Sequence, residues 1–170
     1  EQNRSPDSTK PSITIGNGIN VNSVLMRKCP AFDNSGLNLI CVASASIWHG
    51  IDRVIRGMAH YGQKNVFLHI VGDGSVIPQL QELVMSTGLQ NQVIFHGFKT
   101  GKDLDQFFDK CHIAVGSLGI HRLGLTESSV LKVREYCARG IPFIYSPIDA
   151  DFPDSFPYRL KVPADESPIN

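Results

Sequence analysis

The sequence has no excess of charge of either sign, since 16 Lys and Arg residues balance 16 Asp and Glu residues. Proteins that bind nucleic acids gain much of their affinity by neutralising phosphates with Lys and Arg, and anionic lipid surfaces attract the same basic patches. We therefore expect no nucleic-acid partner and no binding to an anionic surface through charge alone.

Cysteine is scarce, with four residues in a chain of 170, and the sequence contains no CxxC motif. It also lacks two histidines at the spacing of metal ligands, so we expect no metal site and no cofactor. A free cysteine among apolar residues behaves as a small hydrophobic side chain, which indicates reduced thiols rather than disulfides. The four residues are Cys29, Cys41, Cys111 and Cys137.

Long apolar runs are missing as well, because none approaches the roughly 20 residues that span a bilayer. Residues 1–12 are polar and lack the charged and then apolar pattern of a secretory signal. We therefore expect a cytoplasmic protein with no transmembrane segment. With 42% hydrophobic residues, the chain has enough apolar material for one buried core, and its length predicts a single domain.

The sequence does contain a regular alternation of short apolar runs and amphipathic segments. The runs have the length of buried strands, and the segments repeat apolar residues at the spacing of a helix face. We predict strands at 37–43, 66–71, 92–96, 112–116 and 142–145, with a short strand at 158–162. We predict helices at 51–59, 76–87, 102–110 and 128–139.

This alternation predicts an α/β fold, a Rossmann-like doubly wound parallel sheet with helices on both faces. Ligands of such sheets bind in the crevice beyond the carboxyl ends of the strands. The loops to search for chemistry are therefore those at 44–48, 72–75, 97–101, 117–127 and 146–156.

Two glutamates, Glu127 and Glu135, flank seven residues at the expected start of the fourth helix. With a rise of about 1.5 Å per residue, a helix places their carboxylates about 12 Å apart along its axis, a span suited to the two ends of a nucleotide sugar. The amides of Ser128 and Ser129 would face a diphosphate at the helix N-terminus. Taken alone, two solvated helix glutamates remain the alternative.

The segment at 126–142, TESSVLKVREYCARGIP, resembles the Glu-x7-Glu signature of glycosyltransferase family 4, a retaining family with the GT-B fold. Three further segments agree in order. Residues 16–19 resemble the Asn-Gly turn that joins the two GT-B domains, residues 70–74 the glycine turn of the cleft, and residues 93–98 the segment before the base-binding loop. The resemblance covers 15–162 and implies the C-terminal, donor-binding half of such an enzyme.

The resemblance implies a domain that binds a UDP-, GDP- or ADP-sugar, with hexosyl transfer to a glycan or lipid-linked acceptor in polysaccharide biosynthesis. We expect residues 1–18 to be a polar start and linker remnant, 19–163 the domain, and 164–170 a tail before a missing C-terminal helix. The acceptor domain would precede this half, so we expect the chain alone to be inactive. The full-length enzyme would be cytoplasmic or peripheral at the inner membrane.

Carried over to this sequence, the resemblance assigns Glu127 to the transferred sugar, as the catalytic residue, and Glu135 to the ribose hydroxyls. The other contacts implied for the nucleotide sugar comprise three backbone amides, one lysine and several loop residues. They are Ser46, His49, Gly72, Gly74, Phe98, Ser128, Ser129, Val130 and Lys132. A solvated helix residue is an equal alternative for the lysine.

The loop after the first strand departs from the family pattern, which has an Arg and a Lys that bind the diphosphate. Here Ser44 or Ser46 occupies the place of the Arg, and His49 the place of the Lys. Because the charge of histidine changes near pH 6.5, we expect donor binding to weaken as pH rises from about 6 to 8. Arg122 is another candidate cation, although a mobile surface arginine is the simpler interpretation.

Two other functions stay open at this point. A dinucleotide site at residues 72–74 is disfavoured, because Ile77 stands where the third glycine of the motif is needed. A GT-B sugar epimerase would share the fold and the nucleotide site. A non-catalytic α/β interaction module fits the loss of the Arg and Lys but not the glutamate pair.

Overall fold

The computed structural model describes residues 11, 13, 15–32 and 36–169. Six strands form one parallel sheet in the order β3-β2-β1-β4-β5-β6, so the predicted Rossmann-like fold is confirmed. The strands are β1 (Leu37–Val42), β2 (Val66–Val71), β3 (Val93–Phe95), β4 (Ile113–Val115), β5 (Phe143–Tyr145) and β6 (Arg159–Lys161). The helices are α1 (Ile51–Tyr61), α2 (Ile77–Thr87), α3 (Gly101–Phe108) and α4 (Leu131–Ala138), with 3-10 turns η1 (Val21–Ser23), η2 (Ile47–His49) and η3 (Ile120–Leu123).

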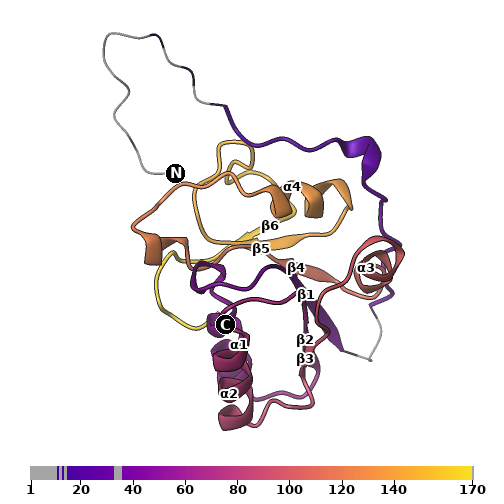
Figure 1. Ribbon diagram of the computed structural model, residues 1–170, viewed down its shortest axis with the longest axis vertical. Helices are drawn as coiled ribbons and strands as arrows, with labels where there is room; N and C mark the ends of the chain where they lie inside the picture. The colour runs from indigo at the N-terminus through magenta and orange to yellow at the C-terminus, as the bar shows by residue number, and fades with distance from the viewer. Residues whose placement is uncertain (1–10, 12, 14, 33–35, 170) are drawn as a thin grey trace.

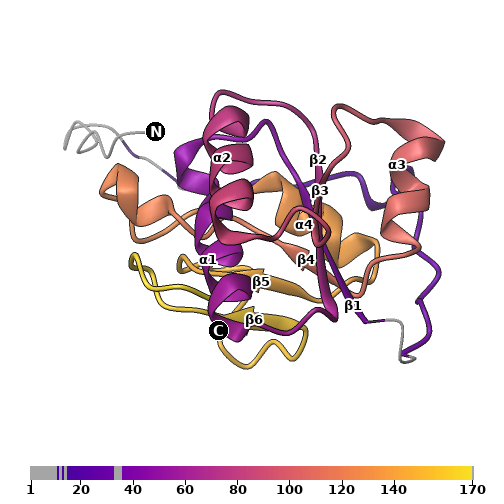
Figure 2. The same ribbon diagram turned by 90° about the horizontal axis from the view of Figure 1, so that it is seen from below.

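Helices cover both faces of the sheet. Figures 1 and 2 show α1 and α2 together on one side, with α3 and α4 on the other. Neighbouring residues of β1 face the two sides in turn: Leu39 and Cys41 join the core under α1 and α2, whereas Ile40 joins the core under α3 and α4. Burial on both faces explains why the strands read as continuous apolar runs rather than as alternating ones.

The strand order reverses between β1 and β4, which are neighbours in the sheet although β2 and β3 separate them in sequence. In open parallel sheets, ligands bind at such a reversal, where the connections leave the sheet on opposite faces and open a crevice. The loops after β1 and β4, together with the start of α4, therefore frame the expected site.

The predicted boundaries differ from the structure by one or two residues in most elements and by three at the start of α4, which begins at Leu131 rather than at residue 128. The Ser128 amide donates to the Ile148 carbonyl at 3.0 Å, and the Ile148 amide donates to the Thr126 carbonyl at 2.9 Å. These bonds form a parallel bridge between Glu127 and Ile148 that holds the segment extended. The helical spacing predicted for the two glutamates therefore does not apply.

Both ends of the described chain pack against the domain. In Figure 1 the N-terminal segment passes over α4 toward α3, and the Arg27 amide donates to the Arg139 carbonyl at 3.0 Å. At the other end, the Ile169 amide donates to the carbonyl of Arg53 in α1 at 3.2 Å. Most of the predicted polar start, 1–10 with 12 and 14, lies outside the described residues, and the predicted division of the chain stays a prediction.

Candidate functional site

Backbone hydrogen bonds join the loops at the carboxyl ends of the central strands. The loop after β1 is tied to the loop after β4, because Leu118 donates to the His49 carbonyl and Gly119 to the Trp48 carbonyl, each at 3.0 Å. It is also tied to the loop after β2, because Ala45 donates to the Asp73 carbonyl at 2.6 Å. The carboxyl end of the sheet is therefore a set of loops that brace one another.

Gly72 and Gly74 make this bracing possible. Their φ angles are +123° and +150°, a backbone conformation that residues with a side chain rarely adopt. A Cβ atom at Gly72 would lie 2.1 Å from the Ala43 carbonyl oxygen, and one at Gly74 would lie 2.2 Å from the Ala45 carbonyl oxygen. Close backbone packing thus explains both glycines without a ligand. Their contact with the donor, which the sequence predicts, stays a prediction.

His49 is buried and carries no positive charge at neutral pH. Its Nδ1 accepts a hydrogen bond from the Ser46 amide at 3.0 Å, so the proton of the neutral ring lies on Nε2. Burial lowers the pKa of His49 to about 3, and the nearby ammonium group of Lys132 adds to this effect. The expected pH dependence of His49 between pH 6 and 8 is therefore wrong, although its Nε2 remains a hydrogen-bond donor.

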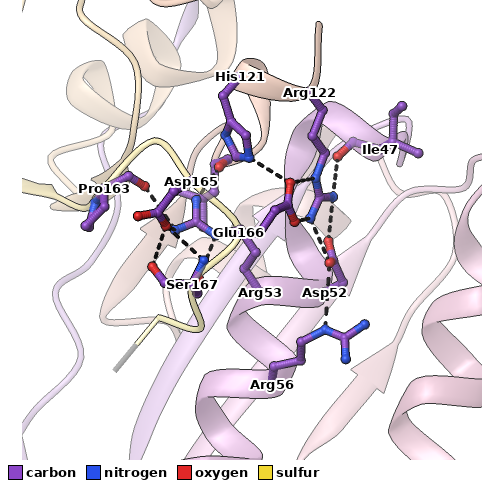
Figure 3. Close-up of polar contacts among 11 residues, drawn as sticks. Ile47, Asp52, Arg53, Arg56, His121, Arg122, Pro163, Asp165, Glu166 and Ser167 are labelled. Carbon is purple, nitrogen blue, oxygen red and sulfur yellow. Dashed lines mark hydrogen bonds and ion pairs between the residues drawn. The ribbon is translucent and has the colours of Figure 1, made fainter. Parts of the chain in front are cut away.

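Arg122 is neither mobile nor free to bind a phosphate. Figure 3 shows its guanidinium between the carboxylates of Asp52 and Glu166. It donates to both oxygens of Asp52 at 2.8 Å, to those of Glu166 at 2.8 and 2.6 Å, and to the Ile47 carbonyl at 2.8 Å. These hydrogen bonds raise the pKa of Arg122 above its usual range. Both interpretations offered for Arg122 by the sequence are corrected.

Arg53 fixes the C-terminal segment on α1. It is fully buried, and it donates to the carbonyl groups of Ser167 at 2.8 Å and Pro163 at 2.9 Å and to the carboxylate of Asp165 at 3.3 Å (Figure 3). Like Arg122, Arg53 uses its guanidinium for hydrogen bonds within the chain. Neither arginine therefore supplies a free positive charge to the crevice.

The segment before α4 holds part of the predicted phosphate site. Glu127 is exposed. The Ser128 amide already donates to the Ile148 carbonyl, so the prediction that this amide donates a hydrogen bond to the diphosphate is wrong. The Ser129 hydroxyl accepts a hydrogen bond from the Asn17 amide at 2.7 Å. Among the described residues, no group accepts from the amides of Ser129 and Val130, which precede the first turn of α4. These two amides remain available to an anion.

Glu135 lies in the second turn of α4 with its side chain one third exposed. Its Oε1 accepts from Arg139 Nε at 2.9 Å, and Arg139 also pairs with Asp105 at 2.7 Å and covers the ring of Phe108. This arrangement holds the carboxylate in one orientation and leaves its second oxygen for another donor. Phe98, in the loop after β3, is 72% exposed.

Lys132 differs from the other cations of the site. The residue is partly exposed at the first turn of α4, but its Nζ is buried and has no hydrogen-bond partner within the described structure. Burial lowers the pKa of its ammonium group. The hydroxyl groups of Ser117 and Ser146, which follow β4 and β5, are also buried without a partner.

A buried ion-pair network joins α4 to the loop after β5, and sequence reasoning missed it. Arg134 donates to both carboxylate oxygens of Asp149, to Asp151, and through Nε to the Asn17 carbonyl at 3.1 Å. The Tyr145 hydroxyl donates to the Ser128 carbonyl at 2.7 Å and contacts Asp149. The Asp-rich composition of the loop after β5 was the only signal, because the arginine's partners are distant in sequence.

A cavity of about 310 Å³ opens beside the same loops, between α1 and α2. Ser46 lines it together with apolar side chains such as Ile47 and Leu80. Its lining is mainly apolar, so it does not extend the phosphate site. In the described part of the chain, no helix has the length and hydrophobicity needed to cross a membrane.

Solved structures with the same fold match most of this chain. The lipopolysaccharide outer core galactosyltransferase WaaB, in its apo form, aligns with 76% of the chain at 20% identity and a TM-score of 0.60. HepE from Anabaena, in complex with UDP, aligns with 79% at 18% identity and a TM-score of 0.63. The C-terminal domain of LpcC from Francisella tularensis aligns with 76% at 18% identity and a TM-score of 0.54.

The matched part is one half of a larger fold. The chain spans 35% of WaaB and 37% of HepE, but 70% of the isolated C-terminal domain of LpcC. No curated protein matches it. The architecture is therefore that of the C-terminal half of a GT-B fold. The family model described as glycosyl transferases group 1 matches residues 26–154, and the chain belongs to that family.

Proposed function

We propose that this domain binds the nucleotide-sugar donor of a retaining glycosyltransferase. The observation that carries the proposal is the segment from Glu127 to Val130 near the reversal of the strand order. It presents an exposed carboxylate and two amides that have no acceptor among the described residues. Such amides at a helix N-terminus suit a diphosphate. HepE was solved with UDP and with UDP-glucose, and GtfA with UDP and GlcNAc, which supports a UDP-sugar over a GDP- or ADP-sugar.

In this proposal Glu135 accepts hydrogen bonds from the two ribose hydroxyls. A carboxylate that is partly shielded from water suits two neighbouring hydroxyls, because hydrogen bonds to a charged acceptor are stronger than neutral ones. Arg139 supports this role by fixing one oxygen of the carboxylate. Phe98 offers its exposed ring to the base, since aromatic faces stack on nucleobases of any sequence.

Glu127 would meet the hydroxyls of the transferred hexosyl group and orient it as the catalytic residue. The bond between the anomeric carbon and the diphosphate breaks during transfer, so negative charge develops on the leaving oxygen. The amides of Ser129 and Val130 are suited to stabilise that charge, because they are oriented before the reaction. His49 Nε2 is a further neutral donor beside the same crevice.

The acceptor is proposed to be a glycan or a lipid-linked sugar, bound mainly by a preceding domain. WaaB is named as a lipopolysaccharide outer core enzyme, which supports a role in polysaccharide assembly. A non-catalytic module remains the competing function. It is favoured because Arg53 and Arg122 are held by hydrogen bonds within the chain and are not free to bind a phosphate. The two functions differ in whether the purified domain binds a nucleotide at all.

Calorimetric titration with UDP, GDP, ADP and NAD tests the proposal. We expect saturable binding of a nucleoside diphosphate and no comparable binding of NAD. Glu135→Ala should weaken that binding about tenfold or more, because it removes hydrogen bonds to a charged acceptor. Glu82→Ala is the matched control, since Glu82 is exposed on α2, which covers the face of the sheet opposite α4 and Glu135. Absence of nucleotide binding by the folded protein would favour the non-catalytic module.

A further inference from the structure

The proposed diphosphate site needs a positive charge, and the arginines near the reversal between β1 and β4 are bound to groups within the protein. Arg122 is held by two carboxylates, and Arg53 by the C-terminal segment. The pKa of His49 lies near 3, so the ring is neutral. Lys99 and Lys102 follow β3 at the edge of the sheet, whereas Lys132 lies on α4, and its buried Nζ has no partner among the residues that the structure describes.

Lys132 is directed toward the crevice between β1 and β4. Its charge opposes the effect of burial on the thiol of Cys41 in β1 and adds to that on His49 in the following loop, so its ammonium group lies near both. The first turn of α4 packs on the end of β4, where a Cβ atom at Gly116 would lie 3.4 Å from Val133 Cγ2. Lys132 therefore extends from α4 toward Cys41 near the end of β1 and His49 in the loop that follows it, and β1 borders the reversal of the strand order.

An unpaired ammonium group is costly to keep in this position, because burial disfavours the charged form and leaves three donors without acceptors. The orphaned hydroxyls of Ser117 and Ser146, at the ends of the neighbouring strands β4 and β5, share this lack of partners. Within the described part of the chain, these three polar groups, which belong to α4 and to the loops after β4 and β5, make no hydrogen bond. An anion that entered the crevice would satisfy them.

We propose that Lys132 is the cation that neutralises the diphosphate of the nucleotide-sugar donor. The inference rests on the proposed function. It adds that the positive charge for the diphosphate comes from the first turn of α4 and not from the loop after β1. The flexible four-carbon chain of lysine lets Nζ move from its buried position to the phosphate, and the partly exposed residue leaves it a route. The amides of Ser129 and Val130, which precede the same helix turn, would bind the same group.

Lys132→Met tests the inference, because methionine fills similar space without charge. We expect the affinity for UDP to fall about tenfold or more, while the affinity for uridine, which has no phosphate, changes less than about twofold. We also expect the melting temperature to rise, since the variant removes an unpaired buried charge. A lysine with only a structural role would give the opposite stability change and no difference between the two ligands.

Matched variants complete the experiment. Lys64→Met removes an exposed lysine before β2, at the opposite end of the sheet, and should change neither affinity nor melting temperature. Lys132→Arg should retain most of the preference for UDP over uridine. If Lys132→Met fails to fold, Lys132→Gln provides the same comparison. Equal UDP binding by wild type and the uncharged variant overturns the inference alone, whereas no nucleotide binding by the wild type overturns the proposed function with it.

Discussion

At the scale of single residues, local sequence and tertiary surroundings often assign different roles. His49 follows a strand as a phosphate-binding residue should, yet burial and the neighbouring Lys132 remove its charge. Lys132 has the sequence context of an ordinary helix lysine, yet its Nζ is buried without a partner. Charge state depends on burial and on residues distant in the chain, so the residue types at the site were predictable and their ionisation was not.

His49 should make the folded domain sensitive to acid. Its pKa is about 3 in the folded state and near 6.5 when unfolded, so below pH 6.5 the unfolded chain binds the extra proton. Stability is therefore full above pH 6.5 and falls as pH drops toward 3, by about 1.4 kcal/mol per unit of pKa difference. Urea unfolding at pH 7.5, 6 and 5 should show that the free energy of unfolding falls less with acid in His49→Gln than in the wild type.

Other histidines also contribute to the acid sensitivity of the folded domain. Burial also lowers the pKa values of His69 and His96, so part of the acid sensitivity should persist in the variant. His60→Gln, at an exposed position of α1, serves as the control and should retain the full slope. An unchanged slope in His49→Gln would show that the imidazole is not kept neutral by burial.

Gly72 offers a second test, of the close approach between the loops after β1 and β2. Gly72→Ala should destabilise the domain by clearly more than about 1 kcal/mol, because it combines a positive φ with a collision with Ala43. Gly124→Ala separates the two causes, since Gly124 has a φ of +70° but open space around it. Equal unfolding free energies for the two variants would contradict the collision, and Gly18→Ala should be nearly neutral.

At the scale of elements, strands were predictable where apolar runs are continuous, and helix boundaries were predictable where only local signals decide them. The start of α4 was not, because the bridge between Glu127 and Ile148 draws the preceding residues into extended structure. The Ile148 side of that bridge lies in the loop after β5, so both α4 and β5 separate it from Glu127 in the chain. No pattern around Ser128 could have shown that its amide was already bonded.

The network of Arg134 should be essential for the position of this segment. Arg134→Met leaves the carboxylate of Asp149 buried without its partner, and breaking such a pair costs about 3 to 5 kcal/mol. Asp149→Asn should cost a similar amount, and the double variant less than the sum of the two. Chemical unfolding of all three variants measures this coupling.

Arg56→Met is the matched control for that cycle. Arg56 is largely exposed on α1, with a carboxylate 4.0 Å away, and exposed pairs of this kind contribute at most about 1 kcal/mol. Strictly additive effects of Arg134→Met and Asp149→Asn would mean that the two side chains do not act as a pair. The nucleotide affinity of the folded variants should also fall, because Arg134 and Tyr145 together hold the segment that carries Ser129.

At the scale of the whole molecule, the carboxyl end of the sheet is a surface rather than an enclosed site. Side chains around it remain exposed although they are large and apolar, among them Trp48, Leu131 and Ile148. WaaB and HepE are about twice as long as this chain, since 76% of it covers 35% of WaaB and 79% of it covers 37% of HepE. The fold supplies one wall for a donor, and we propose that a preceding domain supplies the acceptor wall.

We therefore predict that this chain alone transfers no sugar, even where it binds a nucleotide. Transfer requires the anomeric carbon of the donor to lie roughly 3 to 3.5 Å from an acceptor hydroxyl, and much of the rate comes from that positioning and from closure that excludes water. Glu127 can orient a sugar and the amides of Ser129 and Val130 can receive leaving-group charge, but neither positions an acceptor. Incubation with UDP-glucose and a panel of acceptors, followed by mass spectrometry, should detect only unchanged donor. Transfer or donor hydrolysis that is abolished by Glu127→Ala and retained in Glu82→Ala would show that this half is catalytically sufficient.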